Sequence, residues 1–256
     1  NTYDLLMSEI YEHRALLFLD ILGFKDLVKQ SKTQTILDVL SIPTELQTHE
    51  SGIRRYPFDG TSGMEISAFS DSIVISNLIG DDDFGIVQLV HYAHRLWVKF
   101  LARGVLTRGG IAIGELHHHN SILFGPAMND AYRLESQVAN YPRIVLEKSV
   151  CDQVLAQYQN NSSMDEHMRK IFREDFDGVY HINTLGHHSN FPSEEHRIKK
   201  APGPHGGTSW CDAELMEEKR NFLIDVLSIQ KDSTELRVTA KHDWLRKYAI
   251  ACGISI

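Results

Sequence analysis

Apolar and polar positions in the N-terminal third of the chain follow strand-like and helix-like spacings in turn. The apolar run 15–24 is too short for a helix and breaks at Gly23, which is typical of a buried strand. Residues 25–48 then place apolar side chains at helical spacing. Residues 64–70 alternate apolar and polar positions, and residues 73–78 continue the same register. These last two segments predict a β-hairpin.

The middle of the chain adds more helices and strands. Residues 85–103 give the clearest helical pattern, with apolar positions at three- and four-residue steps. The other predicted elements are a helix at 127–138 and strands at 106–115, 122–124, 143–146 and 180–183. His117, His118 and His119 fall between two of these strands, and we expect them to form a solvated loop. The order of elements predicts an α+β fold in which helices cover a ferredoxin-like sheet.

The C-terminal part of the chain has a different pattern. Residues 186–207 are rich in proline and glycine without periodicity, which predicts a loop or linker. Helices are expected at about 210–230 and 233–251. We therefore divide the chain into a domain at 1–185, the linker, and a helical C-terminal extension at 208–256 that packs on the domain or on a dimer.

The composition is that of an ordinary globular protein. Of 256 residues, 42% are hydrophobic and 23% are charged, which excludes a disordered or low-complexity chain. The formal net charge of −8 argues against a nucleic-acid partner, because such surfaces are usually basic. No apolar run is long enough to span a membrane. The three cysteines are too scattered for a disulfide framework, so we expect a cytoplasmic protein.

Two carboxylates stand where strands end. Asp20 interrupts an otherwise apolar strand, and Asp71 lies at the tip of the predicted hairpin. If these strands are neighbours, the two carboxylates face one point and suit hard divalent cations such as Mg²⁺ or Mn²⁺. Each aspartate alone is better explained as a strand-end or turn residue, whereas the pair favours a metal site.

Other residues suit the binding of phosphate. The turn at Gly23 and Phe24 opens a helix whose free N–H groups could hold phosphate oxygens. Arg108 lies in a strand of apolar and glycine neighbours, where a cation needs an anionic partner. Asn129 and Arg133 are four residues apart on one helix face, where they could orient a ribose and neutralise a phosphate. The alternative is a solvated polar face with Arg133 paired to a nearby acid.

Four motifs, taken in order, resemble those of the class III nucleotidyl cyclases. The resemblance covers about residues 14–150 and lies in FLDILGF at 18–24, Asp71, RGGIAIG at 108–114 and FGPAMNDAYRLES at 124–136. A serine, Ser70, stands where that family usually has a glycine before its second metal aspartate. The resemblance implies a class III cyclase-type sheet covered by helices.

The resemblance also implies roles for individual residues. Asp20, the carbonyl of Ile21 and Asp71 would hold two divalent cations, Mn²⁺ or Mg²⁺. Arg108 and the amides of Gly23–Phe24 would hold the triphosphate.

Two further roles come from the predicted helix at 127–138. By the same resemblance, Asn129 would orient the ribose and Arg133 would stabilise the transition-state phosphate. In this family these two residues and the metal residues come from opposite subunits, which implies a homodimer with shared active sites.

The positions that would read the base depart from the family. Adenylate cyclases have Lys and Asp at two purine-reading positions, and guanylate cyclases have Glu and Cys; here Ser67 and Ile122 stand there. Neither supplies the purine-reading hydrogen bonds. This departure resembles the bacterial uridylate and cytidylate cyclases of Pycsar antiphage defence, whose cyclic product activates a separate effector.

The resemblance favours UTP as substrate, with cyclic UMP and diphosphate as products. CTP is the alternative, since Ser67 can donate or accept a hydrogen bond. A degenerate cyclase fold that binds nucleotide without catalysis, and an unusual adenylate or guanylate cyclase, are the other hypotheses. Arg54, Arg55 and Tyr56 are candidates for narrowing the base pocket, although an exposed loop explains them as well.

Overall fold

The computed structural model describes residues 10–52, 63–80, 83–120, 122–159, 166, 168–186 and 236–254, with side chains from 48 to 52 excepted. The predicted linker beyond residue 186, the predicted helix at 210–230 and Arg54–Tyr56 lie outside these residues. Within them, no helix is both long and apolar enough to cross a membrane.

A mixed sheet forms the centre of the described structure. Its strands are β1 (Glu12–Ile21), β2 (Glu65–Phe69), β3 (Ser72–Leu78), β4 (Thr107–His119), β5 (Ile122–Phe124), β6 (Ile144–Leu146), β7 (Phe172–Glu174) and β8 (Tyr180–Ile182). Their order across the sheet is β2-β3-β1-β4-β6-β8-β7, and β5 pairs with β4 outside this path. The pair β4–β6 is parallel and the other strand pairs are antiparallel.

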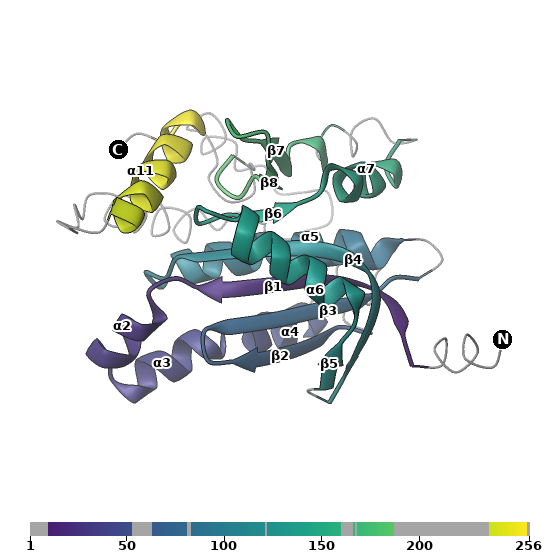
Figure 1. The fold of residues 1–256 in the computed structure, drawn as a ribbon, viewed down its shortest axis with the longest axis horizontal. Helices are drawn as coiled ribbons and strands as arrows, with labels where there is room; N and C mark the ends of the chain where they lie inside the picture. The colour runs from purple at the N-terminus through teal and green to yellow at the C-terminus, as the bar shows by residue number, and fades with distance from the viewer. Residues whose placement is uncertain are drawn as a thin grey trace.

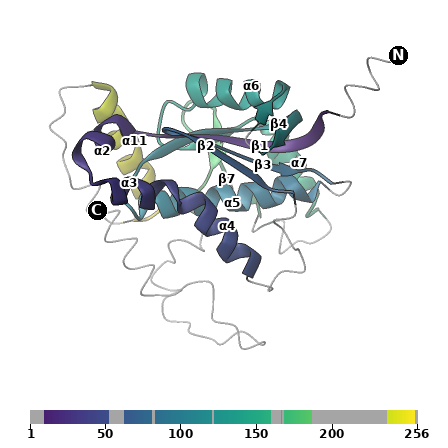
Figure 2. The ribbon, with the colours of Figure 1, turned by 90° about the horizontal axis from the view of Figure 1, so that it is seen from below.

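Helices cover both faces of this sheet. They are α2 (Phe24–Gln30), α3 (Thr33–Leu40), α4 (Ile42–Gly52), α5 (Phe84–Leu101), α6 (Pro126–Arg133), α7 (Lys148–Ala156), α11 (Leu236–Ala251) and the π-helical turn η1 (Leu134–Val138). Figure 2 shows α6 on one face and α4 and α5 on the other. The predicted α+β class, with helices covering a sheet, is confirmed.

The continuous apolar run in β1 follows from burial on both faces. Leu17 and Leu19 belong to the core cluster on the α5 side, whereas Leu16 and Phe18 belong to the cluster on the α6 side. A strand that is covered twice has no position for a solvated side chain along its middle. Asp20 falls on the α6 side, at the end of the strand where the cover stops.

Two glycines let helices and strands approach closely beside β1. A Cβ atom on Gly110 would lie 2.5 Å from the Cβ of Leu134, and one on Gly109 would lie 2.7 Å from the carbonyl oxygen of Phe18. Any side chain at these positions would push η1 or β1 away from β4. These glycines therefore set how η1 lies against the strand that carries Arg108.

Two local predictions are wrong in instructive ways. The predicted helix at 25–48 is three helices, because the chain leaves helical geometry at Ser31 and turns again at Ser41 before Pro43. The histidines at 117–119 are the end of β4 rather than a solvated loop. His118 is only 2% exposed, because the arm formed by β4 and β5 (Figure 1) brings it over β3 and β2.

Helix α11 docks on the part of the chain that contains β7 and β8. The Trp244 ring stacks on Tyr141 at an interplanar angle of 8°, and its Nε1 donates a hydrogen bond to Asp175 at 2.7 Å. Tyr248 is buried and donates its hydroxyl hydrogen to Asn183 at 2.9 Å. The helix beyond the expected linker is thus packed on the domain.

A buried arginine ties the same region together. The side chain of Arg143 is 1% exposed and pairs with Asp175 and, at 2.5 Å, with Asp177. Its guanidinium also lies 5.2 Å from the Tyr141 ring centre and 5.8 Å from that of Trp244. Burial alone would raise the pKa of Asp177, but the contact with Arg143 holds it below its ordinary value.

We expect Arg143→Met to destabilise the protein by about 3–5 kcal/mol, because it leaves the partly buried Asp175 and Asp177 without the cation that pairs with them. Urea unfolding of this variant measures the loss, and the exposed Arg103→Met is the matched control. For the wild type, the contribution of the pair is complete above the ordinary aspartate pKa of 3.8 and is lost as the pH falls below it. A loss for Arg143→Met no larger than for the control would contradict this assignment.

Candidate active site

The two aspartates singled out by the sequence converge at one end of the sheet. Asp20 is next to last in β1, and Asp71 lies in the tight turn between β2 and β3. The backbone N–H of Ile21 donates to the carbonyl oxygen of Asp71 at 2.9 Å, which fixes the turn beside the end of β1. Ser70 takes up the left-handed conformation, φ 58°, in place of the glycine common there. The structure therefore brings Asp20, Ile21 and Asp71 together.

Arg108 lies against this pair of aspartates. It is directly opposite Asp20 in the β1–β4 pairing, and its Nε is 3.4 Å from Asp20 Oδ2. The same Nε is 2.8 Å from Oε1 of Glu135, a residue of η1 that sequence reasoning did not single out. Arg108 thus has the anionic partners that its apolar neighbours demand.

Glu135 is an unusual member of the cluster because it is buried without full hydrogen bonding. Its side chain is 4% exposed, and the contact of Oε1 with Arg108 Nε at 2.8 Å is an ion pair of poor hydrogen-bond geometry. Burial raises the pKa of Glu135, and Asp20 adds to the rise while Arg108 opposes it. Burial also raises the pKa of Asp20, opposed by Arg108 and reinforced by Asp71. Carboxylates are therefore crowded here beyond what one arginine neutralises.

A second cation approaches the cluster from the C-terminal helix. Lys241 is half-buried on the face of α11 that also carries Trp244, Leu245 and Tyr248. Burial lowers the pKa of Lys241, and its charge interacts with those of Arg108, Asp20 and Glu135. No sequence signal could have placed this residue, because nothing local shows where a distant helix docks.

The cluster fits hard divalent cations by the chemistry of its donors. Among the described residues, no group of three or more His, Cys, Asp or Glu side chains is arranged to hold a metal ion. The predicted site instead consists of two carboxylates and one backbone carbonyl, which are oxygen donors. The repulsion between Asp20 and Asp71 and the burial of Glu135 beside them both favour an added positive charge. A bound substrate would have to supply further oxygen ligands.

Asn129 and Arg133 lie elsewhere on the molecule. Both are on the exposed side of α6, whose inner side packs through Ala127 and Ala131. Arg133 pairs with Glu147 at 2.9 Å and lies 3.9 Å from Asp130, so its partners in this chain are outside the carboxylate cluster.

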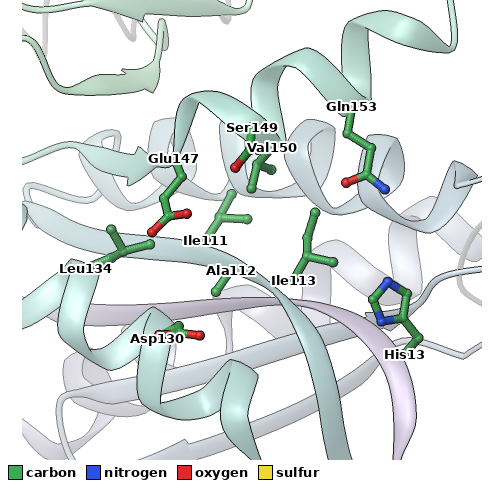
Figure 3. Close-up of a pocket in the computed structure, with 10 residues that line it drawn as sticks. All are labelled: His13, Ile111, Ala112, Ile113, Asp130, Leu134, Glu147, Ser149, Val150 and Gln153. Atoms are coloured by element: carbon green, nitrogen blue, oxygen red, sulfur yellow. The ribbon is translucent and has the colours of Figure 1, made fainter.

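A cavity of about 310 Å³ borders this side of α6. Asp130 and Leu134 come from the helix side, Glu147 and Gln153 from the start of α7 and its first turns, and His13 from β1 (Figure 3). The floor of the cavity is formed by Ile111, Ala112 and Ile113 of β4. Ile111 is the last residue of β4 that pairs with β6. The exposed side of α6 thus borders a cavity whose acidic lining residues, Asp130 and Glu147, both contact Arg133.

The turn after β1 has the helix start predicted to bind phosphate, but its glycine does not itself indicate a ligand. Gly23 has φ 75°, the left-handed conformation that favours glycine, and α2 begins at Phe24. The Gly23 carbonyl accepts hydrogen bonds from the N–H groups of Asp26 and Leu27. A Cβ atom on Gly23 would meet nothing within 4 Å, so its backbone conformation alone explains the glycine.

The two predicted base-reading positions lie near one another on different strands. Ser67 is on β2, and its Oγ lies 2.9 Å from Nε2 of the buried His118 on β4. Ile122 is the first residue of β5, pairs with His119 and is 59% exposed. The roles of both residues stay predictions.

No family model matches this sequence, and no curated protein matches it. Among solved structures, the adenylyl cyclase CyaB from Pseudomonas aeruginosa is 14% identical with a TM-score of 0.46, covering 67% of this chain and 94% of the other. The guanylate cyclase domain of RhGC from Catenaria anguillulae, in complex with GTP, is 14% identical with a TM-score of 0.41, covering 67% and 96%. An adenylate/guanylate cyclase/hydrolase from Silicibacter pomeroyi is 18% identical with a TM-score of 0.39, covering 67% and 96%. Similarity at this level assigns neither a substrate nor a residue role to this chain.

Proposed function

We propose that this protein is a nucleotidyl cyclase that converts UTP to 3′,5′-cyclic UMP and diphosphate. The observation that carries the proposal is the convergence of Asp20 and Asp71, fixed by the Ile21–Asp71 hydrogen bond and faced by Arg108. Two adjacent carboxylates and an arginine at the end of a sheet suit a polyphosphate with its cations. The four sequence motifs, which occur in the family's order, support the same reaction.

The reaction needs a nucleophile, a stabilised phosphorus and a held leaving group. The ribose 3′-oxygen attacks the α-phosphorus and loses its proton to solvent, and the bond from that phosphorus to the bridging oxygen of the diphosphate breaks. Asp20, Asp71 and the Ile21 carbonyl would hold two Mn²⁺ or Mg²⁺ ions, which when bound acidify the 3′-hydroxyl and neutralise phosphate charge. Arg108, held at the cluster by Glu135 at 2.8 Å and Asp20 at 3.4 Å, would contact the phosphates of a nucleotide bound there.

By the resemblance to the class III cyclases, the remaining groups would come from another copy of the chain. Asn129 and Arg133 lie on the exposed side of α6, and Arg133 contacts Glu147 rather than Asp20. We therefore infer a homodimer in which the partner subunit's Asn129 orients the ribose and the partner subunit's Arg133 stabilises the charge that develops at the α-phosphorus.

The substrate preference rests on the two base-reading positions. Ser67 and Ile122 cannot make the paired hydrogen bonds that discriminate a purine edge, and this favours a pyrimidine nucleotide. By resemblance to the pyrimidine cyclases of antiphage defence, the cyclic product would act on a separate effector protein. CTP is the alternative substrate.

A binding module without catalysis is the second candidate, and one observation favours it. Arg108 and Lys241 already place two positive charges at the carboxylate cluster. A degenerate site could use them to hold a nucleotide without cations.

Incubation of the purified full chain with UTP, CTP, ATP and GTP separately, each with Mn²⁺, tests the proposed function. Mass spectrometry of the products should show cyclic UMP and an equal amount of diphosphate, with little product from the purine nucleotides. Binding of UTP without release of diphosphate would favour the binding module, and preferential cyclisation of ATP or GTP would contradict pyrimidine specificity.

A further inference from the structure

A chain of hydrogen bonds runs through the sheet to Ser67. Arg14 Nη1 donates to Ser76 Oγ at 2.9 Å and to the carbonyl oxygen of Gly63 at 2.8 Å. Ser76 Oγ lies 2.8 Å from Nδ1 of His118, and His118 Nε2 lies 2.9 Å from Ser67 Oγ. Arg14, Ser76 and His118 are buried. Ser67, at the end of this series of hydrogen bonds, is half-exposed.

The hydrogen bond from Arg14 to Ser76 fixes which atom donates in the other two hydrogen bonds. An arginine only donates, so Ser76 Oγ accepts from Arg14. The Ser76 hydroxyl still has one hydrogen, and its side chain is fully buried at 0% exposure. Within the described residues its remaining partner is Nδ1 of His118, so Ser76 donates there and Nδ1 is the acceptor. The proton of a neutral His118 is then on Nε2, and Nε2 donates to Ser67 Oγ.

The arrangement in which His118 donates from Nδ1 is less stable. If Nδ1 carried the proton, Ser76 would accept twice and its own hydrogen would be buried without a partner, which reduces stability. Protonation of both ring nitrogens would leave the Ser67 end unchanged, because Nε2 would still donate. Burial, with Arg14 and His117 nearby, lowers the pKa of His118 to about 4, so the neutral ring is the form present at neutral pH.

Ser67 lies where a base would lie if phosphates bind at Asp20. Ser67 pairs with Val74, Val74 pairs with Phe18, and Phe18 is two residues before Asp20 on the same face of the sheet. Two strand spacings across and two residues along give a separation of about 12 Å between the Ser67 and Asp20 positions. That separation reaches the far end of a nucleoside, where a pyrimidine carries its position-4 group opposite the glycosidic bond.

We propose that the Arg14–Ser76–His118 chain fixes Ser67 as a hydrogen-bond donor that reads a carbonyl at position 4 of the base. The proposal rests on the proposed function and deepens it. Ser67 Oγ accepts from His118 and turns its hydrogen toward the ligand. Uracil has a carbonyl oxygen at position 4 that accepts this hydrogen. The amino group of cytosine could use only the second lone pair of Ser67 Oγ and would leave the directed hydrogen without a partner on the base. Ser67 thus discriminates UTP from CTP, and Arg14, Ser76 and His118 are positioning residues.

The tautomer of His118 tests the first half of the proposal without any nucleotide. Long-range ¹H–¹⁵N spectra of the full chain at neutral pH report which ring nitrogen carries the proton, and His118→Phe identifies the signal. We expect a protonated Nε2 and an unprotonated Nδ1. A ring protonated on Nδ1 alone would overturn the proposal, because Ser67 would then donate to His118 and present an acceptor to the base.

Equilibrium binding of non-hydrolysable UTP and CTP analogues tests the second half independently of turnover. The wild type should bind the UTP analogue about tenfold or more tightly than the CTP analogue. Ser67→Ala should bring the two dissociation constants within about twofold, and Ser67→Thr, which keeps the hydroxyl, should preserve the preference. His118→Phe should reduce the preference while leaving Ser67 in place, because the hydroxyl then rotates freely.

An unchanged preference in Ser67→Ala would overturn the proposal whether or not the protein is a cyclase. Conversely, a protonated Nε2 with a lost preference in Ser67→Ala supports it even if no nucleotide is cyclised. Failure of the cyclase proposal therefore appears in the product assay, and failure of this one appears in the tautomer and in the ratio of dissociation constants.

Discussion

Asp20→Asn should reduce the turnover of UTP by about a thousandfold or more while the protein stays folded. The substitution keeps the shape of the side chain and removes the charge that would hold a divalent cation, and loss of such charge stabilisation is worth several kcal/mol. Folding should change little, because burial already raises the pKa of Asp20 and so disfavours its charged form in this protein. Asp71→Asn should behave in the same way.

Turnover measured as cyclic product per minute over a range of Mn²⁺ concentrations checks this expectation. Asp26→Asn is the matched control, since Asp26 is an exposed residue of α2 close to the same turn. Thermal midpoints of the three variants show whether each is folded. Turnover within threefold of the wild type in Asp20→Asn would remove that residue from the metal site.

The second large effect is recovery of activity on mixing two inactive variants. Asp71→Ala removes a metal ligand, and Arg133→Ala removes a cation that in this chain lies on the far side of α6, paired to Glu147. If each active site takes Asp71 from one subunit and Arg133 from the other, a mixed dimer has one intact site. Random assembly makes half of the dimers mixed, so co-expression should recover about a quarter of wild-type activity.

A matched pair of variants makes this result specific. Co-expression of Asp20→Ala with Asp71→Ala should recover nothing, because both changes affect the same half of each site in the proposed dimer. No recovery from the Asp71→Ala and Arg133→Ala pair would mean that the site is built within one chain. The exposed position of α6 would then need another explanation.

Much of what surrounds the candidate site follows from local pattern. The hairpin of β2 and β3 is confirmed, because an alternating segment at 64–70, a short polar break and a second apolar segment at 73–78 are typical of paired strands. Strand β1 is confirmed because its apolar run is too short for a helix. With both in place, Asp20 and Asp71 need only be neighbours in the sheet order to meet.

What the sequence could not show depends on contacts between distant segments. Glu135 lies in a segment whose sequence is mostly polar. It is nevertheless buried against Arg108, because Gly110 has no side chain and η1 can pack closely on β4. His118 looks like one of three solvated histidines until β4 is seen to curve over β3. Lys241 belongs to a helix whose docking is set by the aromatic contacts of Trp244.

These three residues share a physical cause. Each is a polar side chain whose burial depends on how a whole element packs, and hydrophobic periodicity carries no information on that. Polar burial of this kind concentrates at functional sites, so residues that break local rules are informative once the structure is known. The candidate site thus contains polar side chains, such as Lys241, that the four motifs do not include.

Anomalous diffraction from crystals grown with Mn²⁺ and a non-hydrolysable UTP analogue tests the central claim most directly. The account predicts manganese peaks between the carboxylates of Asp20 and Asp71, with the triphosphate bound there and Arg133 of the partner subunit reaching the α-phosphate. Manganese and triphosphate bound away from both aspartates, or no binding at this end of the sheet, would contradict it.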